Sequence, residues 1–227
     1  MSRNLKITLS YDGTEFHGWQ VQPGLPTVQG TLATAIGRIT GENVLPQGSG
    51  RTDAGVHALA QVASVRLRSS IPERNLVIAL NDTLPPAIRV YKVQTVADDF
   101  HARGSAKAKI YRYRIYRNDI CPPFLARYVY HDPYPMDEDA VMHAAQHIVG
   151  EHDFTSFAAS DPDRACRSKD AGGFGGPVSA KAITNVRTVF HVQWARTEEE
   201  LVFAIRGNGF LHHMVRNLIG TFLLAGK

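Results

Sequence analysis

The order of strand and helix patterns restricts the fold of this chain more than any single motif does. Residues 5–9 and 63–67 alternate apolar and polar side chains, which predicts two half-buried strands, and residues 88–96 predict a third. Residues 28–39 place apolar side chains at helical spacing, and a short helix follows residue 72. The residues expected to begin or end these two helices are Thr27, Gly41, Pro72 and the pair Pro85-Pro86.

The second half repeats this plan. Residues 109–116 predict a strand that carries Tyr111 and Tyr113 on one face. A helix from Asp137 to Gly150, strands over 183–194 and 201–206, and a last helix over 210–224 follow. We therefore expect an α+β fold made of a duplicated unit, with one half over residues 1–104 and the other over 105–227. The halves share no sequence identity, so the repeat depends on pattern alone.

A glycine-rich stretch lies between the first helix and the second strand. It reads Gly48-Ser49-Gly50-Arg51-Thr52-Asp53-Ala54-Gly55-Val56-His57-Ala58. Its glycines permit positive φ and close approach of the backbone to a ligand. The stretch also holds one cation, Arg51, and one carboxylate, Asp53. Two interpretations stand at this point: a functional loop, or a turn in which Asp53 bonds to its own backbone.

A family resemblance joins this stretch to motifs over most of the chain. Residues 50–58 are similar to the signature of the TruA-type tRNA pseudouridine synthases. Other motifs follow the order of that family. They are Tyr11-Asp12-Gly13-Thr14 with Gly18-Trp19-Gln20, Phe100-His101-Ala102-Arg103, Tyr111-Arg112-Tyr113, and Gly209-Phe210-Leu211 with Met214-Val215-Arg216-Asn217.

The resemblance implies an architecture and a partner. The family pattern is two ferredoxin-like (RRM-like) halves whose antiparallel sheets join, with helices on one face and a basic cleft on the other. It implies a homodimer that grips one tRNA across both subunits. The substrate would be uridine in the anticodon stem-loop of tRNA, of the type at nucleotide positions 38 to 40.

The resemblance also implies a reaction in which the bond between the ribose and N1 of the uracil breaks, the uracil rotates, and the base rejoins the ribose through C5. Asp53 carries over as the catalytic carboxylate, and its role as nucleophile or as base stays open. Arg216 carries over as the partner of Asp53, where an ion pair would keep the carboxylate ionised. We expect the apolar residues around Arg216 to bury that pair. Tyr111 would stack on the flipped uracil, and Arg51 would fill the space that the base leaves.

Each of these residues also has a structural interpretation. Tyr111 and Tyr113, spaced two residues apart, are typical of a sheet core. Arg51 would be a cation that stabilises the loop. Arg216 would be an ordinary exposed arginine on a helix. Phe210 and Leu211 line either the pocket or the core, and we favour the core. The candidates for phosphate contacts are Arg103, Lys107, Lys109, Arg112, Arg114 and Arg117.

Composition is compatible with a nucleic-acid partner. The formal charge is +4 and the pI is about 9.1. Cations and tyrosines interleave over residues 103–117. The two cysteines, Cys121 and Cys166, are too few for a disulfide framework and lack metal spacing. The sequence begins in a strand pattern and has no apolar run of bilayer length. We therefore expect a cytoplasmic protein without a membrane anchor.

We expect no metal, nucleotide or other cofactor. His212 and His213 are adjacent, so on a helix they would point about 100° apart, and no acid or histidine follows either at i+4.

Two other function classes compete with the isomerase. One is a catalytically silent RNA-binding or RNA-folding module of the same fold, against which the joint presence of Arg51, Asp53, Tyr111 and Arg216 argues. The other is a glycosidase-like hydrolase, which normally needs two carboxylates where the glycine loop offers one.

Two expectations concern the second half. Residues 158–182 are rich in glycine, serine, aspartate and lysine, and form a long loop that either moves freely or closes on a ligand. The last helix stops near Gly226, where the repeat predicts a return to the sheet. We therefore expect the natural chain to continue past Lys227 with one more strand.

Overall fold

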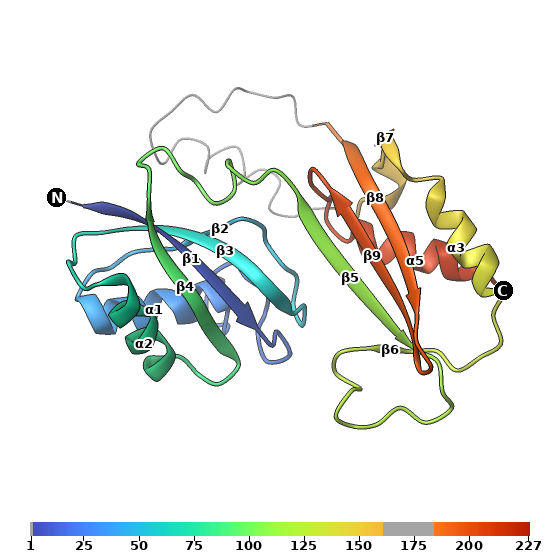
Figure 1. The fold of residues 1–227 in the computed structure, drawn as a ribbon, viewed down its shortest axis with the longest axis horizontal. Coiled ribbons are helices and arrows are strands. Elements are labelled where there is room, and N and C mark those ends of the chain that lie inside the picture. Colours follow the sequence, from blue (N-terminus) through green and yellow to red (C-terminus); the bar gives the residue numbers. More distant parts are fainter. Residues whose placement is uncertain (1, 161–183) are drawn as a thin grey trace. The chain divides into compact units, whose positions relative to one another are not determined.

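The computed structural model describes residues 2–160 and 184–227 and divides into two compact units (Figure 1). The N-terminal unit is Met1–Ala106 and the C-terminal unit is Lys107–Lys227. Each unit combines helices with its own sheet, so the expected α+β class is confirmed.

The N-terminal unit holds a four-stranded sheet in the order β2-β3-β1-β4, antiparallel throughout. Along the chain, its elements alternate as strand, helix, two strands, helix and strand. They are β1 (Arg3–Tyr11), α1 (Val28–Thr40), β2 (Gln47–Gly48), β3 (Ala58–Leu67), α2 (Glu73–Thr83) and β4 (Ile88–Val96). The expected strands and helices are present, and the two-residue strand β2 is an addition.

Alternation along β1 directs one face of this sheet into the core. Leu5, Ile7 and Leu9 are fully buried, whereas the residues between them are half-buried. Helices α1 and α2 cover the buried face with residues that include Leu32 and Leu76. This packing confirms the half-buried strand that the sequence predicts.

The ends of α1 follow local chemistry. Thr27 is the N-cap, and its Oγ1 accepts a hydrogen bond from the Gly30 backbone N–H. Gly41 ends the helix with φ of 73°, in the left-handed region that glycine adopts without strain. Both predicted caps are confirmed. Pro72 is the N-cap of α2, one position before the first helical residue.

The C-terminal unit holds a five-stranded sheet in the order β6-β5-β9-β8-β7. Its elements are β5 (Lys109–Tyr116), β6 (Tyr130–His131), α3 (Glu138–Gln146), β7 (Gly150–Asp153), the 3₁₀ helix η1 (Thr155–Phe157), β8 (Val186–Arg196), β9 (Glu200–Gly207) and α5 (Met214–Ala225). The expectation of a wholly antiparallel sheet is wrong here, because β6 pairs with β5 in parallel. The long connection between these strands permits the parallel crossover.

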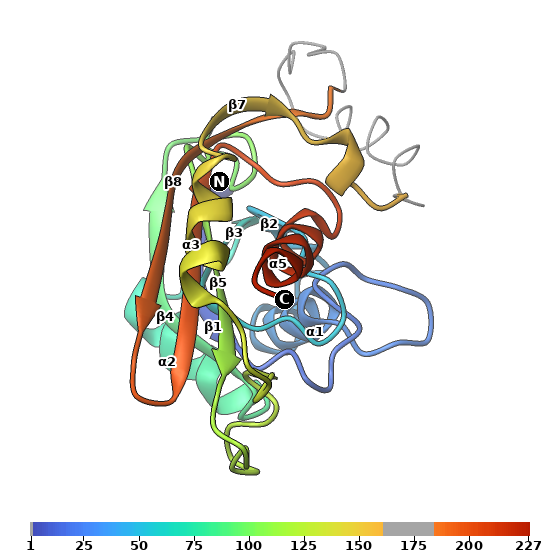
Figure 2. The same cartoon turned by 90° about the vertical axis from the view of Figure 1, so that its right-hand side faces the viewer.

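Helices α3 and α5 pack against each other and cover one face of this sheet (Figure 2). Val141 of α3, Leu218 of α5 and Phe203 of β9 are fully buried in the shared core. Phe222 stacks edge to face on Phe203, with ring centroids 5.7 Å apart. Asp137 is the N-cap of α3, as predicted.

Two helix boundaries differ from the sequence prediction. Helix α3 ends at Gln146, and Gly150 instead begins β7 with φ of 114°. Helix α5 begins at Met214 rather than near residue 210, because His213 adopts a left-handed conformation with φ of 56°. A left-handed residue interrupts the helical ladder, so Phe210 and Leu211 lie outside the helix and His212 and His213 form the turn before it.

Most of the long glycine-rich segment over 158–182, together with Cys166, lies outside the described residues. Among the helices that the structure describes, none is long and apolar enough to cross a membrane.

Candidate active site

Asp53 is half-buried in the loop between β2 and β3. The Val56 backbone N–H donates to the Asp53 carbonyl at 3.1 Å, and Gly55 closes this turn with φ of 75°. Arg51 is half-buried in the same loop. The loop thus has a defined backbone conformation on the C-terminal side of the carboxylate.

The start of the loop is fastened to β3. Ser49 Oγ donates to Gln61 Oε1 at 2.7 Å, and Gln61 Nε2 donates to the Gly50 carbonyl at 2.8 Å. The Ser49 backbone N–H also donates to the Val62 carbonyl at 2.7 Å. Gln61 is buried, so these bonds are shielded from competition with water.

The segment after β1 fastens the other side of the loop. The Trp19 backbone N–H donates to the Thr52 carbonyl at 3.0 Å, and the Gly55 N–H donates to Phe16 at 3.2 Å. The hydroxyl of Tyr11 lies 2.9 Å from Thr52 Oγ1. Asp53 therefore lies between two fixed points, one on each side of it.

His57 ends the loop and joins it to the same segment. Its Nδ1 accepts a hydrogen bond from the Gly13 backbone N–H at 3.1 Å and lies 3.1 Å from Asp12 Oδ1. The sequence motifs around residues 11–14 and 50–58 are therefore one structural unit.

Tyr111 lies on β5 of the C-terminal unit, paired with Ile205 of β9. Its ring meets Phe210 edge to face, with centroids 5.0 Å apart and planes at 77°. Tyr111, Phe210 and Leu211 are half-buried and pack against the core of this unit. The packing of Phe210 and Leu211 agrees with the core position that we favour.

Tyr113 lies near the candidate residues, although the sequence predicts only a core position for it. Burial raises the pKa of its hydroxyl, and the nearby Tyr130 raises the pKa further, while the charge of Arg216 opposes both effects. The Tyr113 and Tyr130 ring centroids are 6.4 Å apart. The opposing effect means that the Arg216 guanidinium is within electrostatic reach of Tyr113.

Arg216 is exposed on the first turn of α5. The expectation that neighbouring apolar residues bury it is wrong, because Met214 and Leu218 face the core and Arg216 lies on another side of the helix. Its ion pair with Asp53 stays a prediction.

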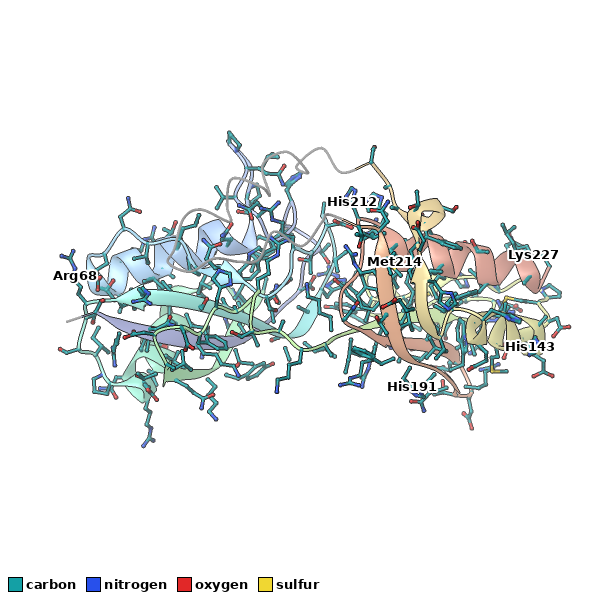
Figure 3. The ribbon with its side chains drawn as sticks, turned by 90° about the horizontal axis from the view of Figure 1, so that it is seen from above. Arg68, His143, His191, His212, Met214 and Lys227 are labelled. Carbon is teal, nitrogen blue, oxygen red and sulfur yellow. The ribbon has the colours of Figure 1, made fainter. Side chains whose placement is uncertain are left out.

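The helical-spacing argument for His212 and His213 is also wrong, because both residues precede α5. Their rings lie 3.9 Å apart at 32°, and His212 Nδ1 lies 3.1 Å from the Ser160 carbonyl. Figure 3 shows His212 and Met214 near the start of α5 and Lys227 at its other end. The expectation that these histidines hold no metal therefore stays a prediction.

The candidate phosphate contacts separate into two groups. Arg114 is held by both oxygens of Glu200, at 2.7 and 2.5 Å, and this hydrogen bonding raises its pKa. Arg117 is almost fully buried beside Asp132 and Glu138, so its expected role as a phosphate contact is wrong. Arg103, Lys107 and Arg112 are exposed, and Lys109 is half-buried. These four stay candidates.

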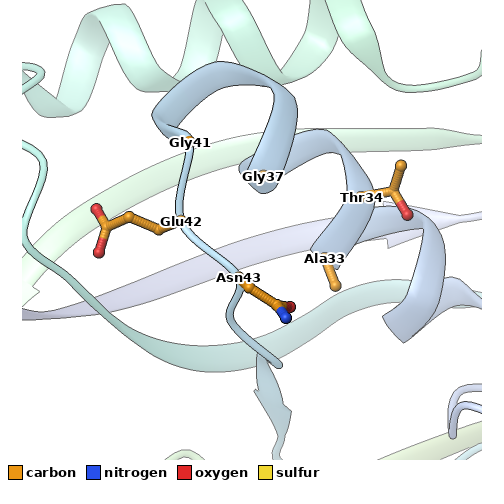
Figure 4. A pocket seen from close by; sticks show the side chains of 6 residues that line it. All are labelled: Ala33, Thr34, Gly37, Gly41, Glu42 and Asn43. Atoms are coloured by element: carbon orange, nitrogen blue, oxygen red, sulfur yellow. The ribbon is translucent and has the colours of Figure 1, made fainter.

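A shallow hollow lies beside the end of α1, lined by Ala33, Thr34, Gly37, Gly41, Glu42 and Asn43 (Figure 4). Its carboxylate, Glu42, accepts hydrogen bonds from the backbone N–H groups of Arg68 and Ser69. Because that carboxylate is engaged in holding two segments together, the hollow is a structural feature rather than a catalytic site.

Comparisons with known proteins bear on the whole chain. A family model described as "tRNA pseudouridine synthase" matches residues 7–103 and 144–227, which include Asp53 and Arg216 but not Tyr111. The tRNA pseudouridine synthase A of Solibacter usitatus is 50% identical over 99% of this chain and 88% of its own length. That of Brevibacillus brevis is 41% identical over 99% of this chain and 85% of its own.

A solved structure, of an unknown protein from Galdieria sulphuraria, covers 99% of this chain and 91% of its own. Its TM-score is 0.26 and its identity 9%, which is too distant to support an inference.

These matches define an isomerase that converts uridine in tRNA to pseudouridine. The chain belongs to the tRNA pseudouridine synthase family.

Proposed function

We propose that the chain isomerises uridine in the anticodon stem-loop of tRNA, with Asp53 as its catalytic carboxylate. The bond between C1′ and N1 breaks and a bond between C1′ and C5 forms. C5 loses its hydrogen and N1 gains one, so the composition of the RNA is unchanged. This reaction needs a fixed carboxylate and no oxidant, and one aspartate on a rigid loop suits it.

The observation that supports this proposal most directly is the fastening of the loop on both sides of Asp53. A carboxylate that only braced a turn would not need anchors from both β3 and the segment after β1. Such anchoring is what a preorganised reacting group requires, because a displacement of about 1 Å can cost about 10²-fold in rate.

Three further residues take the roles that the family resemblance implies. Tyr111 stacks on the flipped uracil, Arg216 pairs with Asp53, and Arg51 fills the space that the base leaves. Base flipping costs a few kcal/mol, which stacking in the pocket offsets. Arg216 is exposed, so its side chain is accessible to a carboxylate or to RNA, which supports this proposal.

The proposal includes an architecture and an assembly. Both units are ferredoxin-like halves with a basic cleft on the face away from the helices. The element order and the strand order β4-β1-β3-β2 of the N-terminal unit support this description. The enzyme acts in the cytoplasm as a homodimer that binds one tRNA across both subunits.

The test of this function is Asp53→Asn beside Asp99→Asn, which removes the same charge at an exposed position of the same unit. We expect Asp53→Asn to abolish pseudouridine formation and Asp99→Asn to retain it. Both variants should bind tRNA within a few-fold of wild type, because one neutralised side chain hardly alters the phosphate-binding surface. Appreciable conversion by Asp53→Asn, with deamidation excluded by mass spectrometry, contradicts the assignment.

A further inference from the structure

Residues 11–19 carry two of the motifs that mark the sequence, and the proposed chemistry gives them no role. They follow β1 and lie against the loop of Asp53. Their backbone bonds reach both sides of that residue, from Trp19 to the carbonyl of Thr52 and from Gly55 to the carbonyl of Phe16. Hydrogen bonds to a segment that follows a buried strand thus hold the loop in its conformation.

Two glycines allow this close approach. A Cβ atom added to Gly13 would lie 2.1 Å from the Val56 carbonyl oxygen. One added to Gly18 would lie 2.5 Å from the Thr52 carbonyl oxygen, and Gly18 also has φ of 84°. Both distances are far below van der Waals contact, so the two backbones touch where any side chain would separate them.

The Tyr11 side chain anchors Thr52, the residue directly before Asp53. Tyr11 is 3% exposed, and its ring lies 6.1 Å from that of Trp19, which is 1% exposed. Because both rings are fixed in the core, the Tyr11 hydroxyl is a fixed point 2.9 Å from Thr52 Oγ1. Thr52 is thereby held by its side chain and, through Trp19, by its backbone.

We propose that Tyr11 is a positioning residue for the reaction, because its hydroxyl fixes Thr52 and thereby the direction in which the Asp53 side chain leaves the loop. This inference rests on the proposed function, in which Asp53 is the catalytic carboxylate. Tyr11 acts through Thr52 and does not touch the substrate. Its loss should therefore lower the rate of conversion and leave tRNA affinity unchanged.

The chain offers a matched control on the same strand. Ser10 Oγ and the hydroxyl of Tyr91 also lie 2.9 Å apart, on the opposite face of β1. Tyr11→Phe and Tyr91→Phe each remove one tyrosine hydroxyl from a hydroxyl pair, and only the first pair reaches the loop of Asp53. The two variants thus separate an effect on the loop from an effect on the strand.

The measurement is the rate of pseudouridine formation in unmodified tRNA, with KM and the melting temperature of each variant. We expect Tyr11→Phe to lower kcat by about tenfold or more, since small misplacements of a reacting group are costly. KM should stay at the wild-type value. Tyr91→Phe should keep the wild-type kcat, and both variants should remain folded at the assay temperature.

Thr52→Val removes the same hydrogen bond from its other partner. It removes the hydroxyl and keeps the branched shape, so it should lower kcat as Tyr11→Phe does. The double variant Tyr11→Phe/Thr52→Val should be no slower than either single variant, because the two changes remove one interaction.

Three results would overturn the inference. They are a wild-type kcat in Tyr11→Phe, an equal fall in Tyr91→Phe, or fully additive losses in the double variant. None of them affects the proposed function, provided that Asp53→Asn is inactive in the same assay. Conversion by Asp53→Asn would overturn the proposed function and this inference together.

Discussion

At the scale of single residues, the chemistry depends on keeping one carboxylate ionised and correctly oriented beside RNA. Asp53 is half-buried, and Thr52, Val56 and Gly55 fix the backbone around it. The backbone thus supplies orientation, whereas a cation must favour the charged form of the carboxylate. In our proposal that cation is Arg216.

Arg216→Lys tests this role of the guanidinium. Lysine keeps the charge but cannot reproduce the planar fork that binds both oxygens of a carboxylate. We expect kcat to fall by roughly 10²-fold, the loss typical of removing one oriented donor. Arg127→Lys, at another exposed arginine of the same unit, should leave kcat unchanged. Wild-type turnover in Arg216→Lys would show that Arg216 is not the partner of Asp53.

Tyr111 is tested by separating its ring from its hydroxyl. Tyr111→Phe keeps the stacking face, and Tyr111→Leu removes both features. If the hydroxyl moves a proton, we expect the phenylalanine variant to bind tRNA normally and to turn over slowly. Tyr113→Phe is the control, because Tyr113 lies two residues further on the same face of β5. Unchanged turnover in both Tyr111 variants would assign Tyr111 to the sheet core.

At the scale of elements, Gly220 within α5 and Gly226, the residue that caps its end, differ in the space around them. A Cβ atom on Gly226 would lie 2.6 Å from Val141 Cγ2 and 2.8 Å from the Asp137 carbonyl oxygen, whereas on Gly220 it would meet nothing within 4 Å. We expect Gly226→Ala to lower the free energy of unfolding by about 1–3 kcal/mol through overpacking. Gly220→Ala should raise it by up to about 1 kcal/mol through helix propensity. Urea unfolding of both variants checks this, and equal effects would contradict it.

The hydrogen bonds of the Glu42 carboxylate lead us to expect that the stability of the protein depends on pH. This carboxylate joins the end of α1 to the end of β3, and the hydrogen bond from the Arg68 backbone lowers its pKa from the usual 4.5. A pKa lower in the folded protein than in the unfolded chain stabilises the fold above the unfolded pKa, and this stabilisation is lost as the pH falls through the folded pKa. We expect Glu42→Gln to cost from a few tenths to about 1 kcal/mol at pH 7, because solvent screens part of the interaction.

The difference between wild type and Glu42→Gln should shrink as the pH falls below about 4.5, where the unfolded carboxyl begins to bind its proton. Unfolding by urea at a series of pH values measures this. Glu15→Gln, at an exposed position of the same unit, is the control for the loss of one carboxylate. A difference that stays constant down to the lowest pH would contradict the role of the carboxylate.

The sequence predicts the regular elements well where local signals agree. Thr27 and Gly41 mark α1, and the alternation from residue 109 to 116 matches β5 to the residue. The sequence does not predict β6, because a two-residue strand has no pattern of its own. It also misplaces the start of α5, because a left-handed histidine has no local signal in the sequence. The sequence predicts Gly150 as a helix stop, although its positive φ serves a turn into β7.

At the scale of the whole molecule, the resemblance identifies the candidate site better than the residue patterns do. No pattern in the sequence joins Tyr11 to Thr52 or Gln61 to Gly50, since these pairs meet only through the folded sheet. The burial of Arg117 and the exposure of Arg216 both differ from the favoured expectations, because the local sequence does not reveal which side of an element faces the core.

The proposed chemistry draws on both units, since Asp53 belongs to one and Tyr111 and Arg216 to the other. Neither unit alone should therefore convert uridine, even where it folds. The proposed homodimer adds that two copies act on one tRNA.

The most direct test of the central claim is the conversion of uridine by the purified wild-type protein. The substrate is an unmodified tRNA transcript with uridine in the anticodon stem-loop, in buffer with EDTA and no added nucleotide. Mass spectrometry after chemical derivatisation counts and locates pseudouridine. We predict stoichiometric conversion on the 3′ side of the anticodon stem-loop and no strand cleavage or free uracil. Release of uracil, or tRNA binding with no conversion, would contradict the account.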